Sequence, residues 1–130
     1  MSTLKVNTVQ HNTSGFNNVV QFQDGGGTEN GKLAKAWVNF NGQGTVAIRD
    51  DFNVNSVSDD ANGKYDINFS NAMSNSNYVA TGTPGDTTAY SASVCGMDFN
   101  APTTTKVSVS VEDLDGGATD RPYVRCVVFN

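Results

Sequence analysis

The feature of this sequence that most constrains its fold is an alternation of apolar and polar residues with a period of two. Turn-forming residues interrupt it at intervals of about ten residues, as expected between the strands of an antiparallel fold. Two of these interruptions are residues 41–44 (NGQG) and 59–63 (DDANG), and Asn-Gly is a strong signal for a β-hairpin. The pattern predicts an all-β fold, an antiparallel β-sandwich of about eight strands with a jelly-roll-like arrangement.

The predicted strands lie near residues 36–40, 45–48, 52–57, 65–69, 78–81, 90–99, 105–111 and 123–129. Pro84, Pro102 and Pro122 fall at the margins of these runs, where the missing N–H donor is tolerated. Because alternate side chains of a strand point to opposite faces, one face of each sheet is expected to build the core.

The first 32 residues differ from the rest of the chain. Leu4, Val6 and Val9 form a short alternating run, which we expect to be an extended strand arm used in assembly. Residues 11–31 are polar and rich in glycine, with one weak strand signal at 16–22, and Gly25–Gly27 indicate a flexible link or a close backbone approach. We therefore divide the chain into an arm and glycine-rich connector at 1–32 and a sandwich domain at 33–130.

The charge of the chain excludes several classes of partner. Lys and Arg number 8 and Asp and Glu number 13, which gives a net charge of −5. Such a chain neither neutralises a phosphate backbone nor is drawn to an anionic membrane, so we expect no nucleic-acid partner. No apolar run approaches the ~20 residues that span a bilayer, and the first ten residues lack the apolar core of a signal peptide. We expect no membrane insertion, and synthesis in a cytoplasm.

Residues that carry catalysis are sparse. The one histidine, His11, lies in the polar connector, and no G-x-S-x-G motif occurs. Neither a catalytic residue nor a cofactor is therefore expected. The carboxylates that could form an acid–base pair are all expected in turn-like segments, where Asp bonds to the local backbone; they are Asp50, Asp51, Asp59, Asp60, Asp113 and Asp115.

Metal and thiol chemistry have equally weak signals. Residues 113–117 (DLDGG) resemble the opening of a calcium loop but lack its remaining ligands, so no metal site is predicted. Cys95 and Cys126 lie in apolar, strand-like runs without a CxxC pair. We expect both to be buried thiols, with a disulfide as the alternative.

Aromatic residues on the predicted strands could serve packing or sugar stacking. Trp37 lies between Ala36 and Val38, so it faces away from them, and we expect it to cover the second face of its sheet or a subunit contact. Stacking on a carbohydrate ring is the alternative. The same two interpretations apply to Tyr65, Tyr78, Tyr90 and Tyr123, with packing favoured.

Three segments of the chain resemble virion proteins of tailed phages. Residues 34–83 (AKAWVNFNGQGTVAIRDDFNVNSVSDDANGKYDINFSNAMSNSNYVATGT) resemble a segment found in tail-fibre and other virion proteins, especially of marine and cyanobacterial phages. Residues 123–130 (YVRCVVFN) resemble the closing strand of the same module, and residues 2–10 (STLKVNTVQ) are similar to the start of such fibre proteins. The resemblance implies a non-enzymatic virion structural protein that is made in the host cytoplasm without a signal peptide.

The resemblance implies two main functions. In the first, the chain is a tail-fibre or appendage component, a homo-oligomer with a trimer favoured, whose loops at 59–63, 82–88 and 112–121 face a host-surface glycan. The candidate binding residues are Asp59, Asp60, Asn62, Asp86, Asp113 and Asp115. In the second, it is a capsid decoration or cement protein whose Leu4, Val6 and Val9 add as a strand to another virion protein. A free-standing carbohydrate-binding module is a third interpretation.

Overall fold

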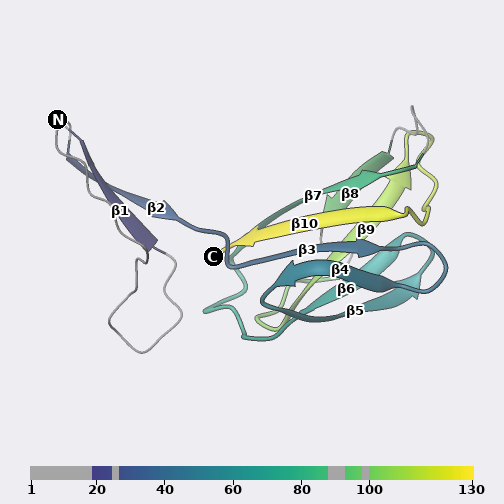
Figure 1. The fold of residues 1–130 in the computed structure, drawn as a ribbon, viewed down its shortest axis with the longest axis horizontal. Coiled ribbons are helices and arrows are strands. Elements are labelled where there is room, and N and C mark those ends of the chain that lie inside the picture. Colours follow the sequence, from purple (N-terminus) through teal and green to yellow (C-terminus); the bar gives the residue numbers. More distant parts are fainter. Residues whose placement is uncertain (1–18, 25–26, 88–92, 98–99) are drawn as a thin grey trace.

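The computed structural model describes residues 19–24, 27–87, 93–97 and 100–130, and these residues form an all-β protein (Figure 1). Within these ranges no helix is long and apolar enough to cross a membrane. The strands are β1 Val19–Asp24, β2 Gly27–Lys32, β3 Ala36–Asn41, β4 Ala47–Phe52, β5 Val54–Ala61, β6 Lys64–Phe69, β7 Val79–Gly85, β8 Ser93–Met97, β9 Lys106–Asp113 and β10 Tyr123–Phe129.

Strands β3 to β10 build a β-sandwich of two four-stranded sheets. One sheet has the order β4-β3-β10-β7 and the other the order β5-β6-β9-β8, and every pairing is antiparallel. The first strand of the sandwich thus pairs with its last. The predicted antiparallel sandwich of eight strands is confirmed.

Strands β1 and β2 form a separate two-stranded sheet in which Val19 pairs with Lys32 and Asp24 with Gly27. The connector therefore contains a hairpin, where the sequence indicated one weak strand near residues 16–22. The hairpin projects from the end of the sandwich at which β3 begins and β10 ends (Figure 1). The predicted arm residues Leu4, Val6 and Val9 lie outside the described residues, as do His11 and Tyr90.

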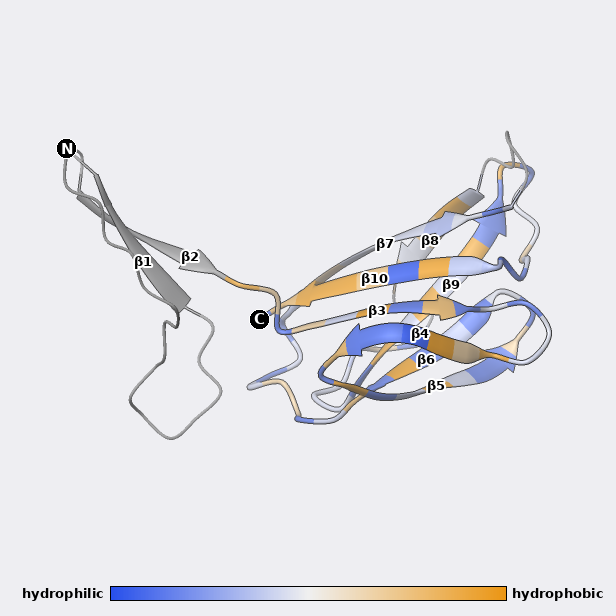
Figure 2. Cartoon of the chain, viewed as in Figure 1, coloured by the Kyte–Doolittle hydropathy of each residue, from blue (hydrophilic) through white to orange (hydrophobic). Residues whose placement is uncertain are grey.

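The core lies between the two sheets and follows the alternation of the sequence. On β3 and β10 every second residue is buried. Figure 2 shows hydrophobic and hydrophilic residues alternating along β3, whereas the second half of β10 is hydrophobic throughout. The Phe40 and Tyr65 rings join the sheets through an edge-to-face contact with centroids 5.1 Å apart, a favourable arrangement for aromatic pairs. The buried apolar residues are Ala36, Val38, Phe40, Val54, Tyr65, Ile67, Phe69, Met73, Val107, Val109, Val111, Val124, Cys126 and Val128.

Gly82 on β7 and Asn53 between β4 and β5 occupy positions that few other residue types could take. A Cβ atom at Gly82 would lie 2.8 Å from the Cys95 sulfur and 2.8 Å from the Arg125 carbonyl oxygen, so only glycine lets β7 lie this close to its neighbours. Asn53, between β4 and β5, has a φ of 58°, which Asn adopts more readily than most residues. Its side-chain amide donates to the Lys35 carbonyl at 3.1 Å and thereby holds the crossover to the second sheet.

Several carboxylates predicted to lie in turns are on strands. Asp50 and Asp51 belong to β4, and Asp59 and Asp60 belong to β5. The prediction was wrong at these positions because strand pairing continues past the last apolar residue, as in the Asp59 pairing with Tyr65. Likewise, β7 extends to Gly85, so most of the predicted loop at 82–88 that the structure describes is strand.

The two cysteines are thiols, as the first of the two interpretations predicted. Cys126 is buried in the core, and Cys95 is half-buried on β8. Burial raises the pKa of the Cys95 thiol to about 11, which keeps it in the unreactive protonated form near neutral pH.

Replacement of a core ring should cost far more stability than replacement of a surface ring. Phe40 has no exposed surface, whereas Phe52 is 40% exposed. We expect Phe40→Ala to lower the free energy of unfolding by about 3–5 kcal/mol, and the control Phe52→Ala to lower it by about 1 kcal/mol or less. Urea unfolding followed by Trp37 fluorescence measures both. Equal losses would contradict the assignment of Phe40 to the core.

Candidate functional site

The predicted binding loops gather at one end of the sandwich. Residues 42–46, 62–63 and 114–122 connect odd-numbered strands to the even-numbered strands that follow them, and Asp86 and Thr87 follow β7. These segments lie at the end opposite the β1–β2 hairpin and the C-terminus (Figure 1). The fold therefore brings together Asn62, Asp86, Asp113 and Asp115, which are distant in sequence.

Most of these candidate residues hold the loop end together. Asn62 donates to the Ala118 carbonyl at 2.5 Å, and Asp86 forms an ion pair with Arg121 at 2.7 Å. The Asp113 carboxylate accepts the Gly117 N–H at 3.0 Å and so caps its own turn. Asp115 is exposed, and Asp59 and Asp60 lie on the exposed end of β5. Of the described candidate residues, Asn62, Asp86 and Asp113 are thus bonded within the protein, whereas Asp59, Asp60 and Asp115 are exposed.

Tyr65 anchors this network to the core. Its hydroxyl donates to the Asp120 carboxylate at 2.6 Å and lies 3.0 Å from the Gly42 carbonyl oxygen. The same Asp120 oxygen accepts the Gly63 N–H at 2.7 Å. Burial, and then the hydrogen bond and negative charge of Asp120, raise the pKa of Tyr65 far above its ordinary value. One buried hydroxyl therefore fixes three connecting segments.

Gly63 is required where the loops meet. Its φ is +67°, and a Cβ atom there would lie 2.4 Å from the Val111 carbonyl oxygen. Both conditions exclude other residues, because a positive φ and a backbone contact this close are open only to glycine. The Asn-Gly signal read from the sequence thus marks a turn and a docking point for the last long loop.

No group of three or more metal-ligating side chains occurs within the described parts of the chain. Asp113, the first residue of the calcium-like run, uses its carboxylate on the Gly117 N–H.

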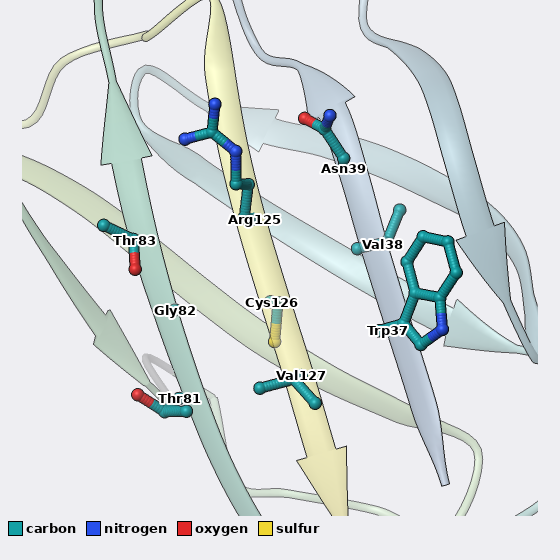
Figure 3. Close-up of a pocket in the computed structure, with 9 residues that line it drawn as sticks. All are labelled: Trp37, Val38, Asn39, Thr81, Gly82, Thr83, Arg125, Cys126 and Val127. Carbon is teal, nitrogen blue, oxygen red and sulfur yellow. The ribbon is translucent and has the colours of Figure 1, made fainter. Parts of the chain in front are cut away.

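A concavity lies elsewhere, on the outer face of the sheet β4-β3-β10-β7. It is a shallow pocket of about 230 Å³ formed by side chains and backbone of β3, β7 and β10 (Figure 3). Its lining residues are Trp37, Val38, Asn39, Thr81, Gly82, Thr83, Arg125, Cys126 and Val127. The volume is below the ~300–1,000 Å³ that holds a drug-sized ligand, so the pocket suits one small ring.

Strand register divides the pocket into two rows. Asn39, Arg125 and Thr83 are direct partners across the three strands and form a polar row. Two residues further along β10, Val127 pairs with Trp37 and Thr81 and forms a mainly apolar row. Figure 3 shows the first row at one end of the pocket and the second row at the other.

Three side chains of the pocket have unused binding capacity. Trp37 is 36% exposed, and Arg125 forms no ion pair with any described residue, although its guanidinium lies 5.3 Å from the Tyr123 ring centroid. The Asn39 Oδ1 atom is shielded from solvent and accepts no hydrogen bond from the described residues. Because this oxygen is shielded, a ligand in the pocket could bond only the Nδ2 group of the Asn39 amide.

The outer face of the other sheet differs in character. There the Asp66 carboxylate forms an ion pair with Lys106 and accepts the Ser108 hydroxyl at 2.5 Å. Asn68 donates to the Ser56 and Ser58 hydroxyls at 3.2 and 3.1 Å. These polar side chains bond one another, which leaves the pocket face as the better place for a ligand.

Sequence reasoning identified Trp37 and missed the other pocket residues. Alternation along a strand puts Trp37 and Asn39 on one face of β3, and Arg125 and Val127 on one face of β10. That these strands are neighbours depends on the pairing of β3 with β10, whose residues are far apart in the chain. No local signal could have indicated it.

Comparison with protein-family models, curated proteins and solved structures found no significant match to this chain.

The Tyr65 hydroxyl should carry a measurable share of the stability. We expect Tyr65→Phe to lower the free energy of unfolding by about 1–3 kcal/mol, because Asp120 loses a buried donor. Tyr123→Phe is the matched control, since the Tyr123 hydroxyl has no hydrogen bond among the described residues. Urea unfolding at pH 7 measures the difference, and equal stability of the two variants would contradict the role of Tyr65.

The same hydroxyl predicts a dependence on pH. Because the folded pKa of Tyr65 is raised, its contribution is fully present below the unfolded pKa of about 10 and is lost as the pH rises above it. Between about pH 9 and about pH 11, on either side of the ordinary tyrosine pKa, we expect the free energy of unfolding of the wild type to fall by more than that of Tyr65→Phe. Parallel curves for the two proteins would show that Tyr65 ionises normally in the fold.

Proposed function

We propose that this chain is a non-enzymatic virion structural protein of a tailed phage, a component of a tail fibre or similar appendage that adheres to a glycan on the host surface. On this proposal it folds in the host cytoplasm, joins copies of itself, with a trimer favoured, and contacts other virion proteins. The resemblance of residues 34–83 and 123–130 to fibre proteins supports the part of the proposal that places the chain in a virion.

The observation that supports the appendage role is that the two ends of the sandwich differ. The hairpin and the C-terminus occupy one end, and the connecting loops occupy the other (Figure 1). A module attached at one end can present its opposite end and its sheet faces outward. The hydrogen bonds of the Tyr65 hydroxyl join two of the described connecting segments at that outer end, which supports its use as one continuous surface.

The attachment end has the character of a contact with protein. Leu33, Val79 and Phe129 are 58%, 68% and 37% exposed, and Val79 pairs with Phe129 in the sheet. Exposed apolar side chains that gather in this way favour a protein neighbour. Among the described strands, β1 and β2 pair only with each other. An isolated two-stranded hairpin is marginally stable in water and gains from such a neighbour.

The hairpin also favours a second candidate function, capsid decoration. In that case residues 1–32 bind the head lattice and the sandwich projects outward. Both candidates use the same attachment end, so the location of the chain on the particle distinguishes them.

Gold-antibody labelling of purified particles tests the proposal directly. We expect label at the tail or its fibres, and addition of the purified chain should reduce adsorption of particles to host cells. Label spread over the head would favour decoration, in which case deletion of residues 1–10 should release the protein from particles. Particles without label would overturn both functions.

A further inference from the structure

The pocket on the outer face of β3, β10 and β7 has the form of a site for a small amphipathic ring. Its polar row, Asn39, Arg125 and Thr83, and its mainly apolar row, Val127 with Trp37 and Thr81, are separated by two residues along each strand. Two residues of strand span about 7 Å, which is comparable to the width of one sugar ring. A pyranose has the matching character, with polar hydroxyls at its rim and an apolar face of C–H groups.

The charge in the polar row selects an acidic sugar. Arg125 is the one charged residue that lines the pocket, and it has no carboxylate partner among the described residues. A guanidinium binds a carboxylate through two parallel hydrogen bonds, a geometry that lysine does not offer. Arg49, whose guanidinium lies 4.4 Å from the Tyr123 centroid, adds a second positive charge on the same face.

The nearest acidic residue by register does not neutralise this charge. Asp50 is the partner of Asn39 on β4, and its carboxylate accepts the Asp51 N–H at 3.0 Å. Strand β3 lies between β4 and β10, so two strand spacings, about 10 Å, separate Asp50 from Arg125 across the sheet. No ion pair joins Asp50 to Arg125, so the guanidinium keeps no carboxylate of the described residues as a partner.

We propose that this pocket binds one uronic acid residue of a saccharide. The sugar carboxylate pairs with Arg125, ring hydroxyls bond the Asn39 amide and the Thr83 hydroxyl, and the apolar face of the ring rests on Val127 beside the Trp37 indole. The inference rests on the proposed function for the source of the saccharide, a host-surface glycan. It places that contact on the sheet face, whereas the sequence placed it on the loops.

The chain provides its own probe, because Trp37 is the single tryptophan and borders the pocket. The experiment titrates the purified full chain with sodium D-galacturonate and D-glucuronate, and separately with D-galactose and D-glucose, which carry CH₂OH at C6 in place of the carboxylate. Sodium acetate serves as the control for a simple carboxylate. We expect a saturable change in Trp37 fluorescence with a uronate, and binding weaker by about tenfold or more for its neutral counterpart.

Two variants test the polar row. Arg125→Ala should weaken uronate binding by about tenfold or more, and Thr83→Val, which keeps the shape of the side chain, should weaken it less. Arg49→Ala is the comparison variant: it removes the other positive charge beside Tyr123, but Arg49 does not line the pocket, so we expect a smaller loss of binding than for Arg125→Ala. Far-ultraviolet circular dichroism verifies that each variant is folded. The proposal is overturned if neither uronate binds, if acetate acts equally, or if Arg125→Ala and Arg49→Ala bind alike.

Failure of this inference can be separated from failure of the proposed function. If the chain blocks adsorption of particles while neither uronate changes Trp37 fluorescence, the appendage role holds and the sugar site is wrong. If a uronate binds through Arg125 but the chain is absent from particles, the pocket stands and the virion role is wrong.

Discussion

The structure depends above all on the position of Tyr65 between the two sheets. Its ring packs edge-on against Phe40 of the opposite sheet, and its hydroxyl leaves the core to meet Asp120 and Gly42. One side chain therefore joins the apolar interior to three of the connecting segments at the loop end. A buried hydroxyl is stabilising only when it is bonded, so the positions of the loops and the packing of the core are coupled.

This coupling explains why the predicted binding loops are poor candidates for a site. Asn62, Asp86 and Asp113 were chosen as polar residues in turns, and the structure uses each of them to close a turn or to join two segments. A polar side chain that is bonded within the protein has fewer donor or acceptor positions left for a ligand. The middle of a sheet is different, because its backbone groups are paired within the sheet and its outward side chains remain available.

The contrast between the two outer faces decides where a ligand would bind. The face around Asp66 bonds its own polar groups to one another, whereas Arg125 and Asn39 retain capacity on the other face. The chain as a whole is acidic, with a net charge of −5. An acidic saccharide would therefore be attracted by the local field of Arg49 and Arg125 and repelled elsewhere, which favours one orientation.

The sequence alone determined the fold class, the two hairpin turns, signalled at 41–44 and 59–63, and the side of β3 on which Trp37 lies. These are local properties: period two and Asx-Gly turns act within a few residues. Where Asp59 and Asp60 lie was predicted wrongly, because strand length depends on the partner strand. Only the tertiary structure decided that β10 lies between β3 and β7, and hence that Asn39, Arg125 and Thr83 form one row. The pairing of strands depends on how much apolar surface the whole core buries. Residues far apart in the chain contribute to that burial together, so no local pattern contains it.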